Sequence, residues 1–337
     1  MRAIPCLLLL LACGDATSPT GPAARPAGAP NAKPTRIEVR SLPSEIQKVQ
    51  MDGSASDAAW QQAREYKLAL DGAGPTEATL RVAMNERYVL FFLVWRDEKP
   101  TRRCVSVLGE DERWKRINEE DGVLFFFPPL EAQEGFDLAT YRTPTGFAYE
   151  GPKGFADVWY WGAQTTDPYE RARDHWLRPK LRLRGDAQPV ESDNIVNWNV
   201  LAERPAGVPK RIDPRTYDWK LPFANAQALD DERYGTLDLK RNIGWRVSSV
   251  IHRRIRGSRG DVLVQSKWAG GAWFVEIARA RETGQRDDHP IGAPGTSTVF
   301  ALGIYDGTGR GTEVGQYGVE AAFSAPIELV FPLVSDG

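Results

Sequence analysis

The stretch TEATLRVAMNERYVLFFLVW, residues 76–95, decides the fold class. Two apolar runs, Thr76–Met84 and Arg87–Trp95, flank the dipeptide Asn85-Glu86. Apolar and polar residues alternate in the first run, as they do on a strand with one buried face. Two such runs joined by a short polar turn predict a β-hairpin.

Short runs of the same kind recur along most of the chain, separated by Gly, Pro and Asp, and Gly270-Gly271 marks a second hairpin. A single helix is expected over Ser56–Arg64, with Ser56 as its N-cap and Trp60 packed under the first strands. The pattern predicts an all-β fold, an antiparallel β-sandwich. The further runs expected to be strands are Thr35–Arg40, Tyr66–Leu70, Gly122–Pro129, Trp245–Ile251, Asp261–Lys267, Ala272–Arg279, Thr298–Tyr305 and Pro326–Leu333.

The segment Thr166–Arg241 breaks this pattern, because it is polar and rich in Pro, Asp and Arg. Loops of this length in compact domains usually serve a site or a partner. We expect a long irregular insertion at 166–241 within one sandwich domain that spans residues 46–337.

The composition excludes one class of partner. The 337 residues include 43 Lys+Arg and 45 Asp+Glu, so the charge is nearly balanced and gives no indication of a nucleic-acid-binding protein. Eleven tryptophans are many for this length, which indicates a large aromatic core or a ligand that contacts aromatic rings.

The first residues, MRAIPCLLLLLACGD, have the form of a secretory signal covering residues 1–12. The end of this signal, Leu10-Leu11-Ala12-Cys13, resembles a bacterial lipobox, in which the cysteine is acylated and becomes the new N-terminus. An ordinary signal peptide with a chance cysteine is the alternative. Residues 13–45, rich in Pro, Gly and Ala, are expected to be a flexible tether. Gly14 after the cysteine predicts the outer membrane, facing the periplasm.

The cysteines and histidines limit the metal chemistry. The three cysteines are Cys6, Cys13 and Cys104, and no Cys-x-x-Cys-His is present, so covalent c-type haem, zinc clusters and iron–sulfur centres are excluded. The three histidines lie far apart in sequence. His289, in a polar turn, is expected to be exposed.

Another stretch, GFADVWYWGAQ at residues 154–164, places Trp159 and Trp161 on one face of an expected strand, together with Asp157. Two tryptophans on one face fill a core or line a pocket for a flat ligand.

Several blocks, in this order, resemble a known family. MDGSASDAAWQQA is similar to the opening of sandwich domains like the family-9 carbohydrate-binding modules. LRVAMNERYVLFFLVWRDE, EEDGVLFFFPP, ADVWYWGA, GDVLVQSKWAGGAWFVEIARARETGQRDDHPIG and FALGIYDG follow. Over about Gln50 to Pro332, this order resembles the haem-binding domain of the ethylbenzene dehydrogenase gamma subunit, also described as the cytochrome c-552/DMSO-reductase-like haem-binding domain.

The resemblance implies a β-sandwich that holds one b-type haem without a covalent bond and passes electrons to or from a redox partner. It places Trp159 and Trp161 beside the haem pocket. Relatives use Met, Lys or His as haem ligands, and a lysine often follows their Trp-x-Trp, where this chain has Gly162.

The ligand candidates are therefore open. Met84 is the best thioether candidate for the haem iron, with Lys153 or His175 as its partner, and the pocket is expected between Trp159–Trp161 and the first hairpin. Core packing is the alternative for Met84, and a solvated surface position for Lys153. His252 is a further candidate. Arg253, Arg254 and Arg256 are candidates for pairing with the haem propionates.

The sequence thus predicts a non-catalytic lipoprotein of the cell envelope that binds haem b and transfers electrons to a periplasmic partner. A haem-free sandwich that binds a carbohydrate or another small ligand is one alternative, and a structural envelope lipoprotein is another. Acidic pairs such as Glu119-Glu120 and Asp287-Asp288 are expected to be solubilising surface groups.

Overall fold

The computed structural model of the protein describes residues 34–43, 50–134, 136–143, 146–147, 154–177, 211–212, 227–228, 243–244, 246–248, 257–285, 288–307 and 319–333. Cys13, Lys153, His252 and Arg253–Arg256 lie outside these residues, as does most of the expected insertion.

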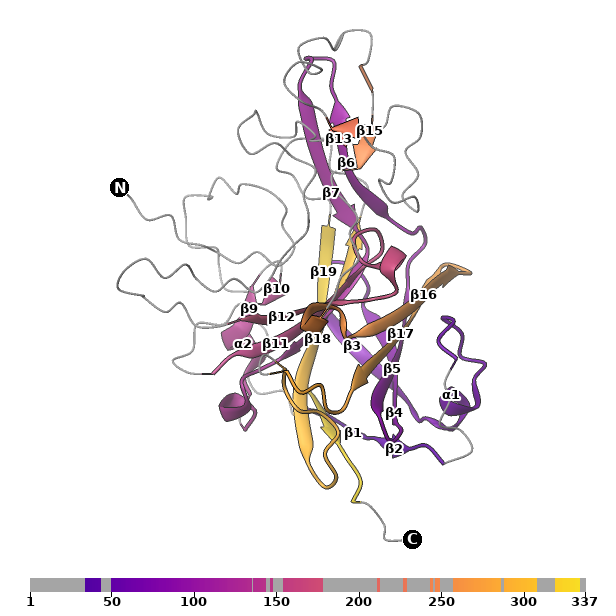
Figure 1. The fold of residues 1–337 in the computed structure, drawn as a ribbon, viewed down its shortest axis with the longest axis vertical. Helices are drawn as coiled ribbons and strands as arrows, with labels where there is room; N and C mark the ends of the chain where they lie inside the picture. Colours follow the sequence, from indigo (N-terminus) through magenta and orange to yellow (C-terminus); the bar gives the residue numbers. More distant parts are fainter. Residues whose placement is uncertain are drawn as a thin grey trace, which may run out of the picture.

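A single large sheet dominates the fold (Figure 1). Along its main path the strand order is β12-β11-β8-β18-β19-β3-β4-β5-β17-β16, and neighbours on this path are antiparallel. Its thirteen strands are β1 (Thr35–Glu38), β2 (Arg40–Ser41), β3 (Glu65–Gly72), β4 (Glu77–Met84), β5 (Tyr88–Arg96), β8 (Gly122–Phe127), β11 (Ala156–Gly162), β12 (Arg173–Leu177), β16 (Leu263–Ala269), β17 (Ala272–Ala280), β18 (Ser297–Gly307), β19 (Val319–Ser324) and β20 (Ile327–Val330).

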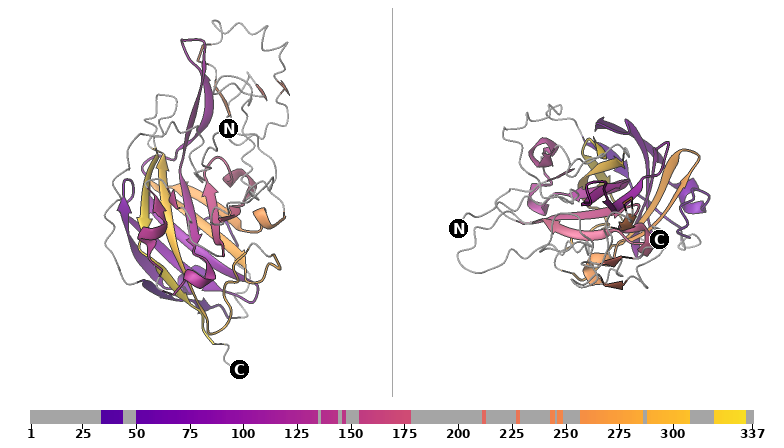
Figure 2. Two further views of the ribbon diagram at one scale, coloured as in Figure 1. Left: turned by 90° about the vertical axis from the view of Figure 1, so that its left-hand side faces the viewer. Right: turned by 90° about the horizontal axis from the view of Figure 1, so that it is seen from above.

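Smaller elements surround this sheet. The β6–β7 hairpin, with β15 alongside it, extends beyond one end of the large sheet (Figures 1 and 2). No helix among the described residues is long and apolar enough to cross a membrane. The smaller elements are β6 (Arg102–Leu108), β7 (Trp114–Glu120), β15 (Arg246–Ser248), β9 (Arg142–Thr143), β10 (Gly146–Phe147), β13 (Arg211–Ile212), β14 (Gln227–Ala228), α1 (Ala58–Gln62), α2 (Leu138–Tyr141) and the 3-10 turns η2 (Leu130–Ala132), η3 (Asp167–Tyr169) and η5 (Gly257–Gly260).

The first hairpin forms as predicted, with β4 paired along β5 from Ala78↔Trp95 to Met84↔Val89. Asn85 builds the turn, because its side-chain Oδ1 accepts the backbone N–H groups of Arg87 and Tyr88 at 2.9 and 2.7 Å. The amide side chain thus replaces part of a backbone turn, which is a common role of Asn.

The sheet curls so that its two halves face each other as a sandwich. One layer runs from β12 to β19 and the other from β3 to β16, and they are continuous where β19 pairs with β3. The opposite edges meet at a seam, which we define as residues 170–172 against residues 262–264. There Ala172 N–H donates to Val262 O and Val264 N–H donates to Glu170 O, both at 3.0 Å. This architecture confirms the predicted all-β sandwich.

Apolar side chains gather in three clusters. The inner core lies between the layers and includes Phe91, Phe125, Trp159 and Phe300. The outer cluster covers the other side of the first layer with Leu124, Phe126, Val158, Tyr160 and neighbouring residues. The third cluster packs α1 against the outside of the second layer.

Helix α1 forms where it was expected but begins differently. Its N-cap is Asp57, without a side-chain capping bond, so the prediction of Ser56 as N-cap is wrong. Trp60 anchors the helix: it is 1% exposed, and its Nε1–H donates to Oε1 of the buried Glu276 at 2.5 Å. The predicted packing of Trp60 under the first strands is confirmed.

Two predicted boundaries are wrong. β1 forms within the expected strand Thr35–Arg40 and pairs in parallel with β20, so the expected tether 13–45 extends too far and the folded part includes Thr35. β12 belongs to the large sheet, although it lies within the expected insertion 166–241. The partner of β1 comes from a distant part of the sequence, whereas β12 pairs with β11, the strand just before it in the large sheet, and is concealed by its polar sequence.

A buried arginine links the segments on either side of the seam. Arg279, on β17, has a side chain that is 0% exposed. Its Nη1 lies 2.6 Å from Asp261, which precedes β16, and its Nη2 lies 3.0 Å from Asp174 on β12 and 2.8 Å from Asp288. Burial alone would lower the pKa of Arg279, but these carboxylates outweigh it and raise that pKa.

We expect Arg279→Met to lower the free energy of unfolding by about 3–5 kcal/mol, because the change leaves buried carboxylates without their cation. Urea denaturation measures this loss. Arg36→Met is the control, since Arg36 is 60% exposed beside Glu328 and its ion pair should contribute about 0–1 kcal/mol. Equal losses of unfolding free energy in the two variants would show that the ion pairs of Arg279 stabilise the fold no more than a surface ion pair does.

Candidate functional site

Strand β11 carries the aromatic stretch that the sequence singles out, and it separates two different environments. Its seven residues are all buried, because β8 and β12 flank it on either side. Trp159 and Trp161 face the inner core, whereas Val158 and Tyr160 face the outer cluster. The two faces of β11 therefore have to be considered separately as candidate sites.

The inner face is filled with aromatic rings. Trp159 lies 4.4 Å from Phe127 and 5.9 Å from Phe91 between ring centroids. Trp161 lies 5.1 Å from Trp273 and 6.2 Å from Trp95. At these separations the rings are in contact. In this structure a flat macrocycle does not fit between β11 and the first hairpin, so the space predicted for the pocket is occupied by the core.

Met84 belongs to the same packed core. It ends β4 opposite Val89 and is 6% exposed. Met84, Trp159 and Trp161 thus share one cluster, but His175 does not, because it lies opposite Val158 on the outer face of β11. Met84 and His175 lie on different sides of a packed layer, so in this arrangement they are not ligands of one iron.

The outer face presents His175 in an unusual environment. His175 is 2% exposed, and its Nδ1 has no hydrogen-bond partner. Burial, followed by the charges of Arg173 and Arg259, lowers the pKa of His175 to about 3, so the imidazole is neutral at physiological pH. Buried polar groups almost always have a partner, and a neutral imidazole nitrogen is a common metal ligand.

Arg173 lies two residues before His175 on the same face of β12. It is 7% exposed, and its guanidinium carbon lies 5.7 Å from the ring centroid of Tyr160. Within the described part of the chain, Arg173 forms no ion pair with a carboxylate. A buried guanidinium without a carboxylate partner is suited to bind an anionic group.

Position 162, where the family resemblance places a lysine, is closed in this chain. A Cβ on Gly162 would lie 2.6 Å from the carboxylate of Glu120. That carboxylate accepts bonds from the Tyr160 hydroxyl at 3.0 Å, from the Gln164 and Thr165 N–H groups at 2.9 and 2.8 Å, and from the Thr165 hydroxyl at 2.7 Å. Four donors fix the Glu120 carboxylate in front of Gly162.

Two surface predictions are wrong. Glu119 and Glu120 are 0% and 8% exposed, because β7 leads directly into the buried strand β8. His289 is 5% exposed, because its backbone N–H donates to Oδ2 of Asp157 at 3.0 Å and its Nε2 lies 3.0 Å from Phe155 O. Asp288, expected at the surface, is one of the carboxylates paired with Arg279.

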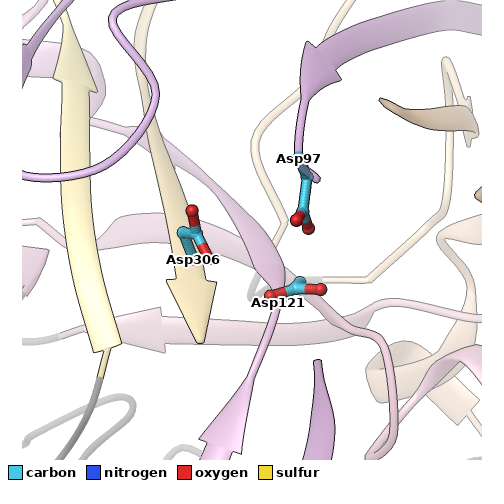
Figure 3. Close-up of side chains that lie close together, drawn as sticks. All are labelled: Asp97, Asp121 and Asp306. Atoms are coloured by element: carbon cyan, nitrogen blue, oxygen red, sulfur yellow. The ribbon is translucent and has the colours of Figure 1, made fainter. Parts of the chain in front are cut away.

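A second group of carboxylates lies where β5, β8 and β18 meet. Asp97, Asp121 and Asp306 point toward one another (Figure 3). Oδ2 of Asp97 and Oδ2 of Asp121 both lie within 3.0 Å of Trp273 Nε1. Burial, with the charge of Asp97, raises the pKa of Asp121 to about 8 against the opposing backbone bonds from Thr101 and Gly307. These contacts join strand ends, so this group has a structural explanation.

The residues that sequence reasoning missed are Arg173 and Glu120. Recognition of Arg173–Leu177 as a strand paired with β11 would have placed Arg173 and His175 opposite Tyr160 and Val158. The run RDHWL does not alternate between polar and apolar residues, so the sequence revealed neither this strand nor its pairing with β11.

We expect Gly162→Ala to destabilise the protein by about 1–3 kcal/mol, because the new methyl group overlaps the fixed carboxylate of Glu120. In the Glu120→Ala background the same change should cost less, and a double-mutant cycle from urea denaturation measures the difference. Equal costs in both backgrounds would show that Glu120 does not close this position.

Comparisons with known proteins bear on this arrangement. A comparison with curated proteins found no similar sequence. Among solved structures, a family 9 carbohydrate binding module from Caldicellulosiruptor kristjanssonii, in complex with cellotriose, is similar at 10% identity and a TM-score of 0.36, covering 90% of this chain and 96% of that chain. A putative carbohydrate-binding protein from Bacteroides uniformis has 9% identity and a TM-score of 0.37, with 89% and 100% covered.

A comparison with protein-family models matches most of the chain. A family model described as ethylbenzene dehydrogenase matches residues 42–316. This match covers both layers of the sandwich, including β11, β12 and the seam. The chain belongs to the ethylbenzene dehydrogenase family.

Proposed function

We propose that this chain is a b-type haem protein that transfers electrons in the cell envelope, held to the membrane by a lipid on Cys13. Family membership and the chemistry of the outer face of β11 and β12 support the proposal. The observation that carries it is His175, a buried, neutral imidazole whose Nδ1 has no partner.

The groups on the outer face match what a haem requires. Such a site needs an axial ligand, apolar surroundings and cations for the two propionates. His175 would supply the ligand nitrogen, and the charges of Arg173 and Arg259 lie close enough to act on His175. The outer cluster, which includes Phe126, Val158 and Tyr160, supplies the apolar surface. When bound, haem would supply one-electron redox chemistry.

The chain's own residues define how such a group would be held. Binding would be non-covalent, because the sequence has no Cys-x-x-Cys-His. Arg173 would pair with a propionate while its stacking on Tyr160 fixes its direction. Glu120 excludes a lysine from position 162, so in this chain the ligand would come from β12 and not from β11.

A haem-free module for a carbohydrate or another small ligand is the second candidate. The observation that favours it is also the closure of Gly162 by Glu120, which removes the ligand position that relatives use. Absorption in the Soret region separates the two candidates, because a haem-free module has none after expression with ample haem.

We expect the full chain, purified and titrated with haemin, to bind it one to one with a Soret band. His175→Gly should weaken binding about 10–100-fold or more, because even changes to groups that only orient a ligand cost that much. Added imidazole should restore the spectrum. His289→Gly is the matched control, since His289 is also buried with an Nδ1 that has no partner among the described residues, but its Nε2 contacts Phe155 O and it does not lie on β12 beside Arg173.

An unchanged spectrum and affinity in His175→Gly would remove His175 as the ligand. Absence of haemin binding by the unaltered chain would remove the haem proposal itself and leave the haem-free module.

The membrane tether gives a separate expectation. The full chain should partition into the membrane fraction, because two acyl chains on Cys13 give a stable anchor. Cys13→Ser should release it into the soluble fraction, and Cys6→Ser, the control within the same signal, should not. Membrane partition that survives Cys13→Ser would contradict the anchor.

A further inference from the structure

The cluster of charged residues around Arg279, beside the seam, contains more buried negative charge than its cation can balance. Four aspartates, Asp157, Asp174, Asp261 and Asp288, act on one guanidinium, that of Arg279. The side chains of Asp174 and Asp288 are 3% and 2% exposed, and Asp157 is 0% exposed. Unbalanced buried charge is costly, so the site must gain positive charge in some form.

The ion pairs of Arg279 leave part of this site unsatisfied. Arg279 is in contact with Oδ2 of Asp174, Oδ2 of Asp261 and Oδ2 of Asp288. Asp157 forms no ion pair within these distances. Its Oδ2 accepts the N–H of His289 at 3.0 Å, whereas its Oδ1 accepts no hydrogen bond from an N–H or hydroxyl group of the described residues. A completely buried carboxylate oxygen without a donor is a rare feature of a folded protein.

The carboxylates converge at a spacing that suits a metal ion. One oxygen each from Asp157, Asp174 and Asp288 lies within 4.8 Å of the other two. Ca²⁺ binds carboxylate oxygens at about 2.3–2.6 Å, so oxygens on opposite sides of the ion are up to about 5 Å apart. Oxygen ligands favour Ca²⁺, Mg²⁺ or Mn²⁺ over softer metals.

We propose that Asp157, Asp174 and Asp288 form a binding site for a divalent cation, with calcium as the favoured ion, that completes the closure of the sheet beside Arg279. The ion would reduce the excess of buried negative charge and give Oδ1 of Asp157 its missing partner. It would also join β11, β12 and the segment after β17. This inference is independent of haem binding.

The pKa values of Asp157 and Asp174 describe the protonated alternative to a metal ion. Burial raises the pKa of Asp157 to about 6, reinforced by Asp288 and opposed by Arg279, the N–H of His289 and a hydrogen bond with the side chain of Asp174. Burial and the charge of Asp157 raise the pKa of Asp174 against the effect of Arg279. Protons shared among the carboxylates are the other way to balance the site, and the experiment below separates protons from a metal ion.

Asp97, Asp121 and Asp306, shown in Figure 3, are a weaker candidate for binding the cation. Oδ1 and Oδ2 of Asp121 accept the N–H groups of Gly307 and Thr101, and Oδ1 of Asp97 accepts the N–H of Lys99. Both carboxylates therefore have donors, in contrast to Oδ1 of Asp157.

The test measures the melting temperature of the full chain and the binding of calcium. After treatment with EDTA, the protein should bind one Ca²⁺ per chain in isothermal titration calorimetry. Calcium at about a hundredfold excess over its Kd should raise the melting temperature by about 5 °C or more. Asp157→Asn should abolish this rise and the binding. Its melting temperature in EDTA should equal or exceed that of the unaltered chain, because one uncompensated charge is gone.

Asp306→Asn, in the other carboxylate group, is the matched control and should keep the full response to calcium. Three outcomes overturn the proposal: no effect of calcium on the unaltered chain, a response that persists in Asp157→Asn, or a response lost only in Asp306→Asn. The first would mean that protons balance the seam, and the last would place the ion at Asp97, Asp121 and Asp306.

Discussion

One buried arginine lies where the two edges of the curled sheet meet and pairs with carboxylates from both sides. Arg279 contacts carboxylates from before β16, from β12 and from the segment after β17. Strand β12 is a short edge strand that pairs with β11, and Arg279 together with two backbone bonds at the seam joins its beginning to the opposite edge of the sheet. Because His175 and Arg173 flank Asp174 on that strand, the candidate ligand-binding face depends on the same contact.

The two faces of β11 lie in different surroundings. On the inner face, Trp159 and Trp161 pack against rings from both layers, which explains a large share of the unusual tryptophan content as core. On the outer face, His175 is buried with an Nδ1 that has no hydrogen-bond partner, and Arg173 is buried with no carboxylate ion pair, both within the described part of the chain. The rings of the outer cluster are also in contact, with Phe126 5.5 Å from Tyr141, so the outer face differs from the inner face by its polar groups His175 and Arg173 and not by free space.

The sequence predicts the fold better than the site. Alternation and a polar turn are local signals, so the β4–β5 hairpin, the Trp60 helix and the sandwich class could be recognised, and the ordered blocks indicated the family correctly. β6, β7, β12 and β19 carry polar residues on buried or paired positions, which hides their periodicity. The burial of Glu120 and His289 depends on partners such as Thr165 and Asp157, which lie far away in the sequence.

The central claim is that His175 offers its imidazole nitrogen to a haem iron on the outer face of β12. Pulsed electron paramagnetic resonance of the ferric haem-loaded full chain, made with ¹⁵N-labelled histidine, tests this claim directly. We expect a ¹⁵N hyperfine coupling from one imidazole in the unaltered chain and in His289→Gln, and its loss in His175→Gln. A haem-loaded chain without ¹⁵N coupling, or with a coupling that survives in His175→Gln, would contradict the account.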